Sequence, residues 1–335
     1  MFFIHTLALN LDDTDAFYKW RSKKKYRLRE GEDGLQTDFV FINQGMRVEY
    51  DGRHQKRIKL IVNPSRVLGC NDLEPWKPSG KNVKGFLAEL EGLIDDYFES
   101  EIELNDFRLS RVDFTCNLNV GDREKVSGYI RLLHGMGKVK GFSTLFSKYD
   151  YDVRGINKAN SFDLSGNSNG IEFCAYDKEG AIENIAEKLK RKEAESQLKL
   201  ASGILRVEVR LTKAKAIRRY TDETDTTKQI KDLYKQCEDI FIDMFQRIVP
   251  RGNYYKKKKA EALIQDRVSK KSLRVKMLRL LELVPEKKSL LLAQKELNVR
   301  NIDRVMEMFA EIDVSPVTIS KRHDVKELES LYAYL

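Results

Sequence analysis

The sequence predicts an α+β fold in which helices pack on a largely antiparallel sheet, followed by an all-helical C-terminal domain. Through the first 220 of the 335 residues, short runs of alternating apolar and polar residues are joined by turn residues. Segments with apolar residues at helical spacing interrupt these runs, and from about residue 221 the helical spacing dominates. We therefore expect two domains, one of residues 1–220 and one of residues 221–335.

Each expected strand rests on two-residue alternation. The turn residues at 43–45 and 51–54 connect short alternating runs, which predicts an antiparallel meander over residues 38–62. Residues 150–170 are rich in Gly, Asn and Ser, and we expect a mobile loop or hairpin that enters the next strand. The predicted strands span residues 2–10, 38–43, 46–51, 56–62, 107–118, 171–178 and 204–212.

The expected helices show apolar residues at three- and four-residue spacing. One helix is predicted over residues 122–136, with Asp122 as its N-cap. A long amphipathic helix follows the capping cluster at 221–227 and ends at Pro250. The remaining helices are predicted at residues 83–99, in a charged segment before residue 204, and at 266–283, 286–296 and 300–311. The last two have the rhythm of a helix-turn-helix, so helix 300–311 either reads a DNA groove or packs its apolar side into a core.

The charge of the chain favours nucleic acid as a partner. The formal net charge is +9 and the pI is about 9.1. An anionic membrane surface would also attract it, but no apolar run is long enough to cross a bilayer, so we expect no membrane partner. The four cysteines lie far apart and lack a C-x-x-C pair, which argues against a zinc knuckle and a disulfide scaffold and fits a location in the reducing cytoplasm. The four histidines are not closely paired, which argues against a multi-histidine metal site.

Three predicted strands carry polar side chains along one face. Such a face is either a solvated sheet surface with cross-strand ion pairs or an active site on a rigid sheet. The first strand contributes Arg111, Asp113 and Thr115; the second contributes Glu172, Tyr176 and Lys178; the third contributes Arg206, Glu208, Arg210 and Thr212.

Together these residue types suit phosphodiester chemistry. Asp113 and Glu208 offer carboxylate oxygens for Mg²⁺ or Mn²⁺. Tyr176 can act as a covalent nucleophile. A phenol has an ordinary pKa near 10, and a cation such as Lys178 would favour the phenolate. Lys and Arg side chains would offset the charge of the transition state, and Arg206 is either solvated or in contact with phosphate.

A basic run with two tyrosines follows the long helix. It is either a solvated linker or a DNA contact in which aromatic rings stack on unpaired bases and lysines contact phosphates. Its members are Tyr254, Tyr255, Lys256, Lys257, Lys258 and Lys259.

At these motifs the sequence resembles the replication initiators of filamentous phages, the gene II/X family, and more distantly the plasmid rolling-circle initiators. The matching stretches are IKLIVNPSRVLG (58–69), LSRVDFT (109–115), CAYDKE (174–179) and LASGILRVEVRLT (200–212), in the same order over roughly residues 56–215. The resemblance implies a rolling-circle nuclease-like fold. It also implies that Tyr176 is the nicking nucleophile, Lys178 its companion, Asp113 and Glu208 metal-site candidates, and Arg111 and Arg210 phosphate or structural partners.

The sequence departs from these families in two respects. Glu172 does not correspond to an acid of the family, and the His-hydrophobic-His motif of many rolling-circle nucleases is missing from the sequence.

The hypothesis from the sequence is a site-specific enzyme that nicks and joins single-stranded DNA. It would initiate rolling-circle replication of a phage or plasmid through a 5′-phosphotyrosyl intermediate formed by the domain of residues 1–220, with residues 221–335 as a DNA-binding or accessory domain. Its expected partners are origin DNA, a host helicase and a host DNA polymerase. The alternatives are a conjugative relaxase, which uses the same chemistry, and a non-catalytic DNA-binding regulator.

Overall fold

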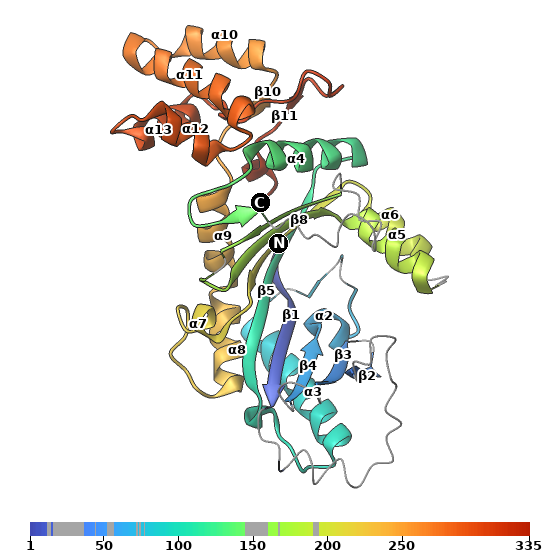
Figure 1. Cartoon of the computed structure of the whole chain (residues 1–335). Helices are drawn as coiled ribbons and strands as arrows, with labels where there is room; N and C mark the ends of the chain where they lie inside the picture. Colours follow the sequence, from blue (N-terminus) through green and yellow to red (C-terminus); the bar gives the residue numbers. More distant parts are fainter. Residues whose placement is uncertain are drawn as a thin grey trace. The chain divides into compact units, whose positions relative to one another are not determined.

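A computed structural model shows the fold of the chain (Figure 1). It describes residues 1–11, 15, 37–43, 45–51, 57–71, 73, 75–76, 78–144, 160–166, 168–189 and 194–335. The predicted turn at 51–54, beyond Asp51, and residues 150–159 of the predicted loop lie outside the described residues.

Nine of the described strands form one sheet, in the order β2-β3-β4-β1-β5-β9-β8-β7-β6. Every pairing with a described register is antiparallel: β1 with β4, β2 with β3, β3 with β4, β6 with β7, and β7 with β8. The strands are β1 (Phe2–Leu11), β2 (Thr37–Asn43), β3 (Met46–Asp51), β4 (Arg57–Val62), β5 (Arg108–Asn119), β6 (Ser143–Thr144), β7 (Ser161–Ser165), β8 (Ile171–Asp177) and β9 (Ile204–Leu211). The predicted α+β class with a largely antiparallel sheet is confirmed.

Helices occupy the connections of the sheet and most of the C-terminal part. They are α2 (Pro64–Val67), α3 (Gly80–Phe98), α4 (Arg123–Met136), α5 (Lys178–Leu189), α6 (Ala194–Ala201), α7 (Ala214–Ile217), α8 (Thr226–Lys235), α9 (Cys237–Ile248), α10 (Lys257–Arg267), α11 (Lys271–Lys287), α12 (Leu290–Leu297) and α13 (Ile302–Glu311). A short ladder of β10 (Tyr254–Tyr255) with β11 (Glu327–Leu328) is added to the expected helices of the C-terminal part. None of the helices within the described residues has the length and apolarity needed to cross a bilayer.

Side-chain caps fix where the main helices begin. The Asp122 carboxylate accepts a hydrogen bond from the Lys125 amide at 2.7 Å, which confirms the predicted N-cap of α4. Ser79 caps α3 and Asp225 caps α8 in the same way.

The long amphipathic helix expected after residue 221 is instead two helices, α8 and α9. The break lies at Gln236, whose side-chain amide donates to the Tyr220 carbonyl at 2.8 Å. The expected hairpin before residue 171 is present, because β7 pairs with β8 and places Ser161 opposite Tyr176.

The chain forms two compact units, each built from three segments. The first contains residues 1–115, 169–171 and 209–241, and the second contains residues 116–168, 172–208 and 242–335. Strands β5 and β9 each pass from one unit into the other. These units do not follow the expected boundary at residue 220, so the functional division into 1–220 and 221–335 stays a prediction.

Each unit has its own aromatic core. In the first unit, the rings of Phe2 and Phe241 lie 5.2 Å apart. In the second unit, the Phe173 and Phe245 rings lie 6.3 Å apart, and Phe245 also contacts Tyr332. Thus β8 is packed through Phe173 against α9, which gives the strand a rigid support.

We expect Gly203→Ala to destabilise the protein by about 2 kcal/mol or more in urea unfolding. Gly203 immediately precedes β9 and has a φ of +72°, and a Cβ there would lie 2.5 Å from the Gly121 carbonyl carbon. Gly92→Ala is the matched control: its Cβ meets no atom within 4 Å on α3, and helix propensity predicts a gain of about 0.5–1 kcal/mol. Equal stability of the two variants would show that the close approach at Gly203 is not required.

Candidate active site

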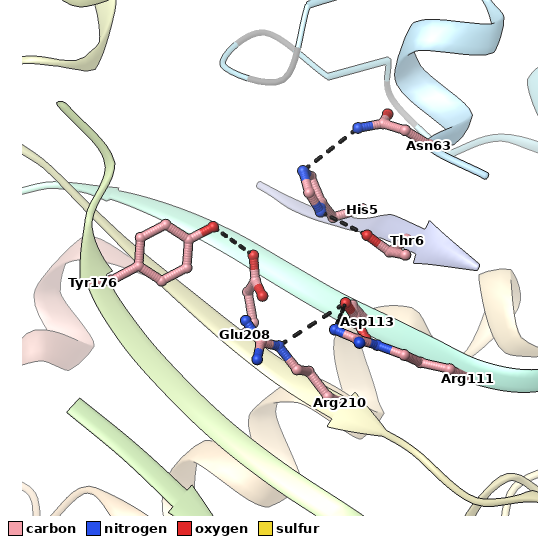
Figure 2. A network of polar contacts seen from close by, with 8 residues as sticks. All are labelled: His5, Thr6, Asn63, Arg111, Asp113, Tyr176, Glu208 and Arg210. Atoms are coloured by element: carbon pink, nitrogen blue, oxygen red, sulfur yellow. Dashed lines mark hydrogen bonds and ion pairs between the residues drawn. The ribbon is translucent and has the colours of Figure 1, made fainter. Parts of the chain in front are cut away.

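A tyrosine and a buried carboxylate form a hydrogen-bonded pair on neighbouring strands. The Tyr176 hydroxyl on β8 donates to Glu208 Oε1 on β9 at 2.8 Å, and Figure 2 shows the phenol directed at this carboxylate. Tyr176 is half-buried, whereas Glu208 is 2% exposed. A carboxylate at this distance can accept the phenol proton.

The alternation of β8 places Tyr176 on the polar face of the strand. Ile171, Phe173 and Ala175 are buried, as expected for one face, while Glu172 and Tyr176 are half-buried on the other. Because β8 lies between β9 and β7, its backbone is held from both sides. The predicted position of Tyr176 on a rigid sheet is therefore confirmed.

A second polar group lies in the first unit and centres on Asp113. Its side chain is 2% exposed, and Arg111 donates to both carboxylate oxygens, from Nε and Nη2, at 2.7 Å each. Arg210 Nε lies 3.9 Å from Asp113 Oδ2, and Figure 2 shows the three side chains. Two guanidinium groups thus share one carboxylate, which leaves a net positive charge in this group.

The first unit also contains a histidine contact that the sequence analysis did not single out. His5 Nδ1 lies 2.9 Å from Thr6 Oγ1, and His5 Nε2 lies 3.5 Å from Asn63 Nδ2 (Figure 2). Asn63 also caps α2 through its side-chain oxygen. In the sequence, this contact is indicated only by Asn63, which lies in one of the four stretches that resemble the phage initiators.

Four of the polar positions on β5 and β9 are buried, whereas Arg111 and Arg210 are partly exposed. Asp113 and Thr115 on β5 are 1% and 0% exposed, and Arg206 and Glu208 on β9 are 0% and 2% exposed. Burying charged groups is costly unless they are paired and hydrogen-bonded. These polar positions are therefore built into the protein interior.

The expected phosphate contact or solvation of Arg206 is contradicted by its burial. Its side chain is fully buried, and its Nε donates to Asn117 Oδ1 on β5 at 2.8 Å. A guanidinium in this position joins two strands and does not reach a DNA backbone.

Lys178 lies two residues after Tyr176 but is the first residue of α5. It is 7% exposed, so its ammonium group is largely removed from solvent. The change from strand to helix after Asp177 ends the alternation that placed Lys178 on the face of Tyr176. Its role as a companion of the nucleophile stays a prediction.

An ion-pair network beside Tyr176 was not predicted from the sequence. Arg123 Nε donates to Asp177 Oδ2 at 3.1 Å, and the same guanidinium makes two hydrogen bonds to Glu183. The hydrogen bond to Glu183 raises the pKa of Arg123 above its ordinary value. This network fixes the end of β8 directly after Tyr176.

Of the two carboxylates expected to bind a metal ion, Glu208 fits that role better than Asp113. No group of three or more His, Cys, Asp or Glu side chains in the described part of the chain is placed to hold a metal ion. Asp113 is bound through both oxygens by Arg111, so an ion pair fits this residue better than a metal. Mg²⁺ often binds to one or two carboxylates together with substrate phosphates, and Glu208 fits that pattern.

The basic run at 254–259 is largely engaged within the second unit. Tyr254 is 2% exposed against the Tyr129 ring, and burial raises the pKa of its phenol, so the expected stacking on a base is wrong for this side chain. Lys256 donates to the carbonyls of Ser320 and His323.

The rest of the run begins α10 and is less buried. Lys259 pairs with Glu327 and lies over the Tyr255 ring, and Lys257 lies 3.5 Å from Glu261. Lys258 is exposed. DNA contact by Tyr255, Lys257, Lys258 and Lys259 stays a prediction.

Helix α13 packs its apolar side into the second unit. Val305 and Phe309 are 1% and 0% exposed, as in the packing alternative. On its exposed side Arg304 pairs with Glu307 and Glu311. The acidic side chains make this face unfavourable for a phosphate backbone, so the structure favours packing over groove reading.

The chain was compared with family models, curated proteins and solved structures. No protein-family model and no curated protein matches the chain. A rolling circle replication initiator protein from Geobacillus stearothermophilus is similar at 12% identity and a TM-score of 0.30, over 74% of this chain and 84% of that chain. At these values the similarity assigns no function to this chain.

Proposed function

We propose that this protein is a tyrosine-dependent enzyme that nicks and joins single-stranded DNA and thereby initiates rolling-circle replication of a phage or plasmid. The observation that carries the proposal is the 2.8 Å hydrogen bond from the Tyr176 hydroxyl to the buried Glu208 carboxylate. A nucleophile paired with a base in this way is the arrangement that covalent catalysis requires. The net charge of +9 and the resemblance of four motifs to phage initiators support DNA as the substrate.

In the nicking step, Tyr176 Oη attacks a DNA phosphorus atom and Glu208 accepts the phenol proton. A bond forms between Tyr176 Oη and phosphorus, and the bond between phosphorus and the 3′ oxygen breaks. The leaving 3′ oxygen takes a proton from water, which leaves a 5′-phosphotyrosyl link and a free 3′-hydroxyl. A DNA polymerase would extend this 3′ end while a helicase separates the strands.

In the joining step, a 3′-hydroxyl attacks the phosphotyrosine. Its proton passes to water, the bond between phosphorus and Tyr176 Oη breaks, and Glu208 returns a proton to the phenolate. The phosphodiester is restored without a nucleotide cofactor, because the ester retains the free energy of the broken bond.

Arg111 and Arg210 are proposed to attract the phosphate backbone. Together they carry one positive charge more than Asp113 neutralises. Such a cationic group favours a phosphate.

Mg²⁺ or Mn²⁺ is proposed to bind together with the DNA, with Glu208 as the protein carboxylate and phosphate oxygens as further ligands. Such an ion would polarise a phosphoryl oxygen. We expect no adduct in EDTA and recovery on addition of Mg²⁺ or Mn²⁺, measured as protein–DNA adduct on a denaturing gel. Equal adduct yield with EDTA and with metal would remove the metal from the proposal. Asp113→Asn is expected to keep the metal dependence, because both Asp113 oxygens are bound by Arg111.

The test of the function uses single-stranded oligonucleotides of random sequence and supercoiled DNA of the replicon that carries the gene. We expect a denaturation-resistant protein–DNA adduct and relaxation of the supercoiled DNA. A DNA-binding regulator would bind the same DNA and leave it intact with every metal tried. A conjugative relaxase would give the same adduct but act at a transfer origin.

A further inference from the structure

A cationic pocket in the second unit is separate from the Tyr176–Glu208 pair. It has a volume of about 450 Å³ and is lined by α4, by Lys257 at the start of α10, by the end of α11 and by the segment 318–323. Its lining residues are Gly128, Arg131, Leu132, Gly135, Lys257, Pro285, Lys288, Thr318, Ile319, Ser320, Lys321, Arg322 and His323.

Glycines of α4 leave room for the pocket. Gly128, Arg131, Leu132 and Gly135 are spaced three and four residues apart and therefore share one face of the helix. A Cβ at Gly135 would meet only Val317 at 3.8 Å, so the hollow at this point exists because no side chain fills it.

The opposite walls are anchored to the fold by backbone contacts. Lys256 donates to the Ser320 and His323 carbonyls, and the Ile319 amide donates to the Tyr255 carbonyl at 2.9 Å. Next to Lys288, the Ser289 hydroxyl donates to the Lys138 carbonyl just after α4, at 3.2 Å. The segments that carry the cationic side chains are therefore held in place, as expected for a built site.

Charge is the feature that identifies the ligand. Five arginine and lysine side chains line the pocket, and the described lining includes no acidic residue. Arg131, Lys288, Lys321 and Arg322 are exposed, and only Lys257 among the five has an acidic partner that is described, Glu261 at 3.5 Å. So many like charges repel one another, and an anion with several oxygens would relieve that repulsion.

His323 provides a buried donor in the same wall. Its Nδ1 accepts from the Val325 amide at 3.2 Å, so the neutral ring carries its proton on Nε2. This Nε2 is buried beside Gly128 without a hydrogen-bond partner in the described structure. Burial, followed by the positive charges of Arg131 and Lys256, lowers the pKa of His323, while Glu124 and Asp324 act in the opposite direction.

We infer that this pocket binds the phosphate groups of a nucleic acid strand, at a site distinct from the proposed nucleophile. The inference rests on the proposed DNA function, which it extends by a second anchoring point for the strand. Exposed lysines and arginines around a groove attract a polyanion, and each phosphate contact adds to the salt dependence of binding. A free phosphate or a nucleotide offers the same oxygens, and the experiment separates these sources.

The experiment measures binding of a fluorescent mixed-sequence single-stranded oligonucleotide by anisotropy, using full-length Tyr176→Phe protein so that no covalent step contributes. Arg131→Glu and Lys288→Glu are expected to weaken binding at least about tenfold at 50 mM salt, and to reduce the slope of log K against log salt by about 0.7 for each lost contact. Lys271→Glu is the control, because this exposed residue at the start of α11 makes the same charge change outside the pocket. Unchanged thermal unfolding of each variant shows that the fold is intact.

A second measurement follows the His323 ring by NMR during pH titration with inorganic phosphate or with the oligonucleotide. Bound phosphate is expected to raise the pKa of His323, because it favours the charged ring. If inorganic phosphate changes the pKa of His323 while DNA affinity stays unchanged in both pocket variants, the pocket does not bind a nucleic acid strand. It would then be a site for a small phosphate. No effect in either measurement would overturn the inference, and failure of nicking by wild-type protein would leave this binding result untouched.

Discussion

Tyr176→Phe is expected to abolish the covalent protein–DNA adduct and to lower the nicking rate by at least about 10³-fold. The substitution removes the oxygen that attacks phosphorus and keeps the aromatic ring. It also breaks the hydrogen bond to Glu208. DNA affinity measured by anisotropy should stay within about twofold of wild type, because phosphate contacts by Lys and Arg supply most of the binding free energy.

Tyr97→Phe is the matched control for this prediction. Tyr97 is half-buried on α3, and the change removes the same hydroxyl group at a position with no proposed role. Full adduct formation by Tyr176→Phe, or its loss in the control alone, would exclude Tyr176 as the nucleophile. Loss of DNA binding by Tyr176→Phe would instead assign Tyr176 to binding.

The second large effect is expected for Glu208→Gln. The glutamine side chain keeps an oxygen that can accept the hydrogen bond of Tyr176, but it does not take up the phenol proton. Loss of a general base reduces the rate by about 10²–10⁴-fold, so we expect a fall in the single-turnover nicking rate within that range. DNA affinity measured in EDTA should be unchanged, since Glu208 is 2% exposed and its proposed link to DNA runs only through a metal ion.

Glu172→Gln tests whether this effect is specific. Glu172 lies on the same face of β8 as Tyr176 and is half-buried, but no catalytic role is assigned to it. A nicking rate of Glu208→Gln equal to that of wild type would show that the contact between Tyr176 and Glu208 is structural. An equal fall in both variants would point to the general charge of this face.

The fold and the position of Tyr176, the proposed nucleophile, could be predicted because they follow from local periodicity. Alternation in residues 171–177 places Phe173 and Ala175 on one face of the strand and Tyr176 on the other. In the structure Phe173 and Ala175 are buried and Tyr176 is half-buried. The Asp122 cap of α4 is likewise a local signal.

Features that depend on contacts between residues far apart in the chain could not be predicted from the sequence. The pattern of β9 predicts a polar face, but whether Arg206 and Glu208 meet solvent depends on what covers that face, and both are buried. Tyr254 begins a basic run in the sequence, yet its ring packs on Tyr129 of α4. The Arg123–Asp177 pair joins residues 54 positions apart.

The most direct test of the account is the identity of the residue that carries the DNA. Adduct formed by wild-type protein on single-stranded DNA is digested with protease and nuclease, and the modified peptide is sequenced by mass spectrometry. We expect a 5′-phosphonucleotide on the tyrosine of the peptide that contains Cys174, Ala175 and Tyr176. A modified tyrosine elsewhere in the chain, or a nick without any attached nucleotide, would contradict the account.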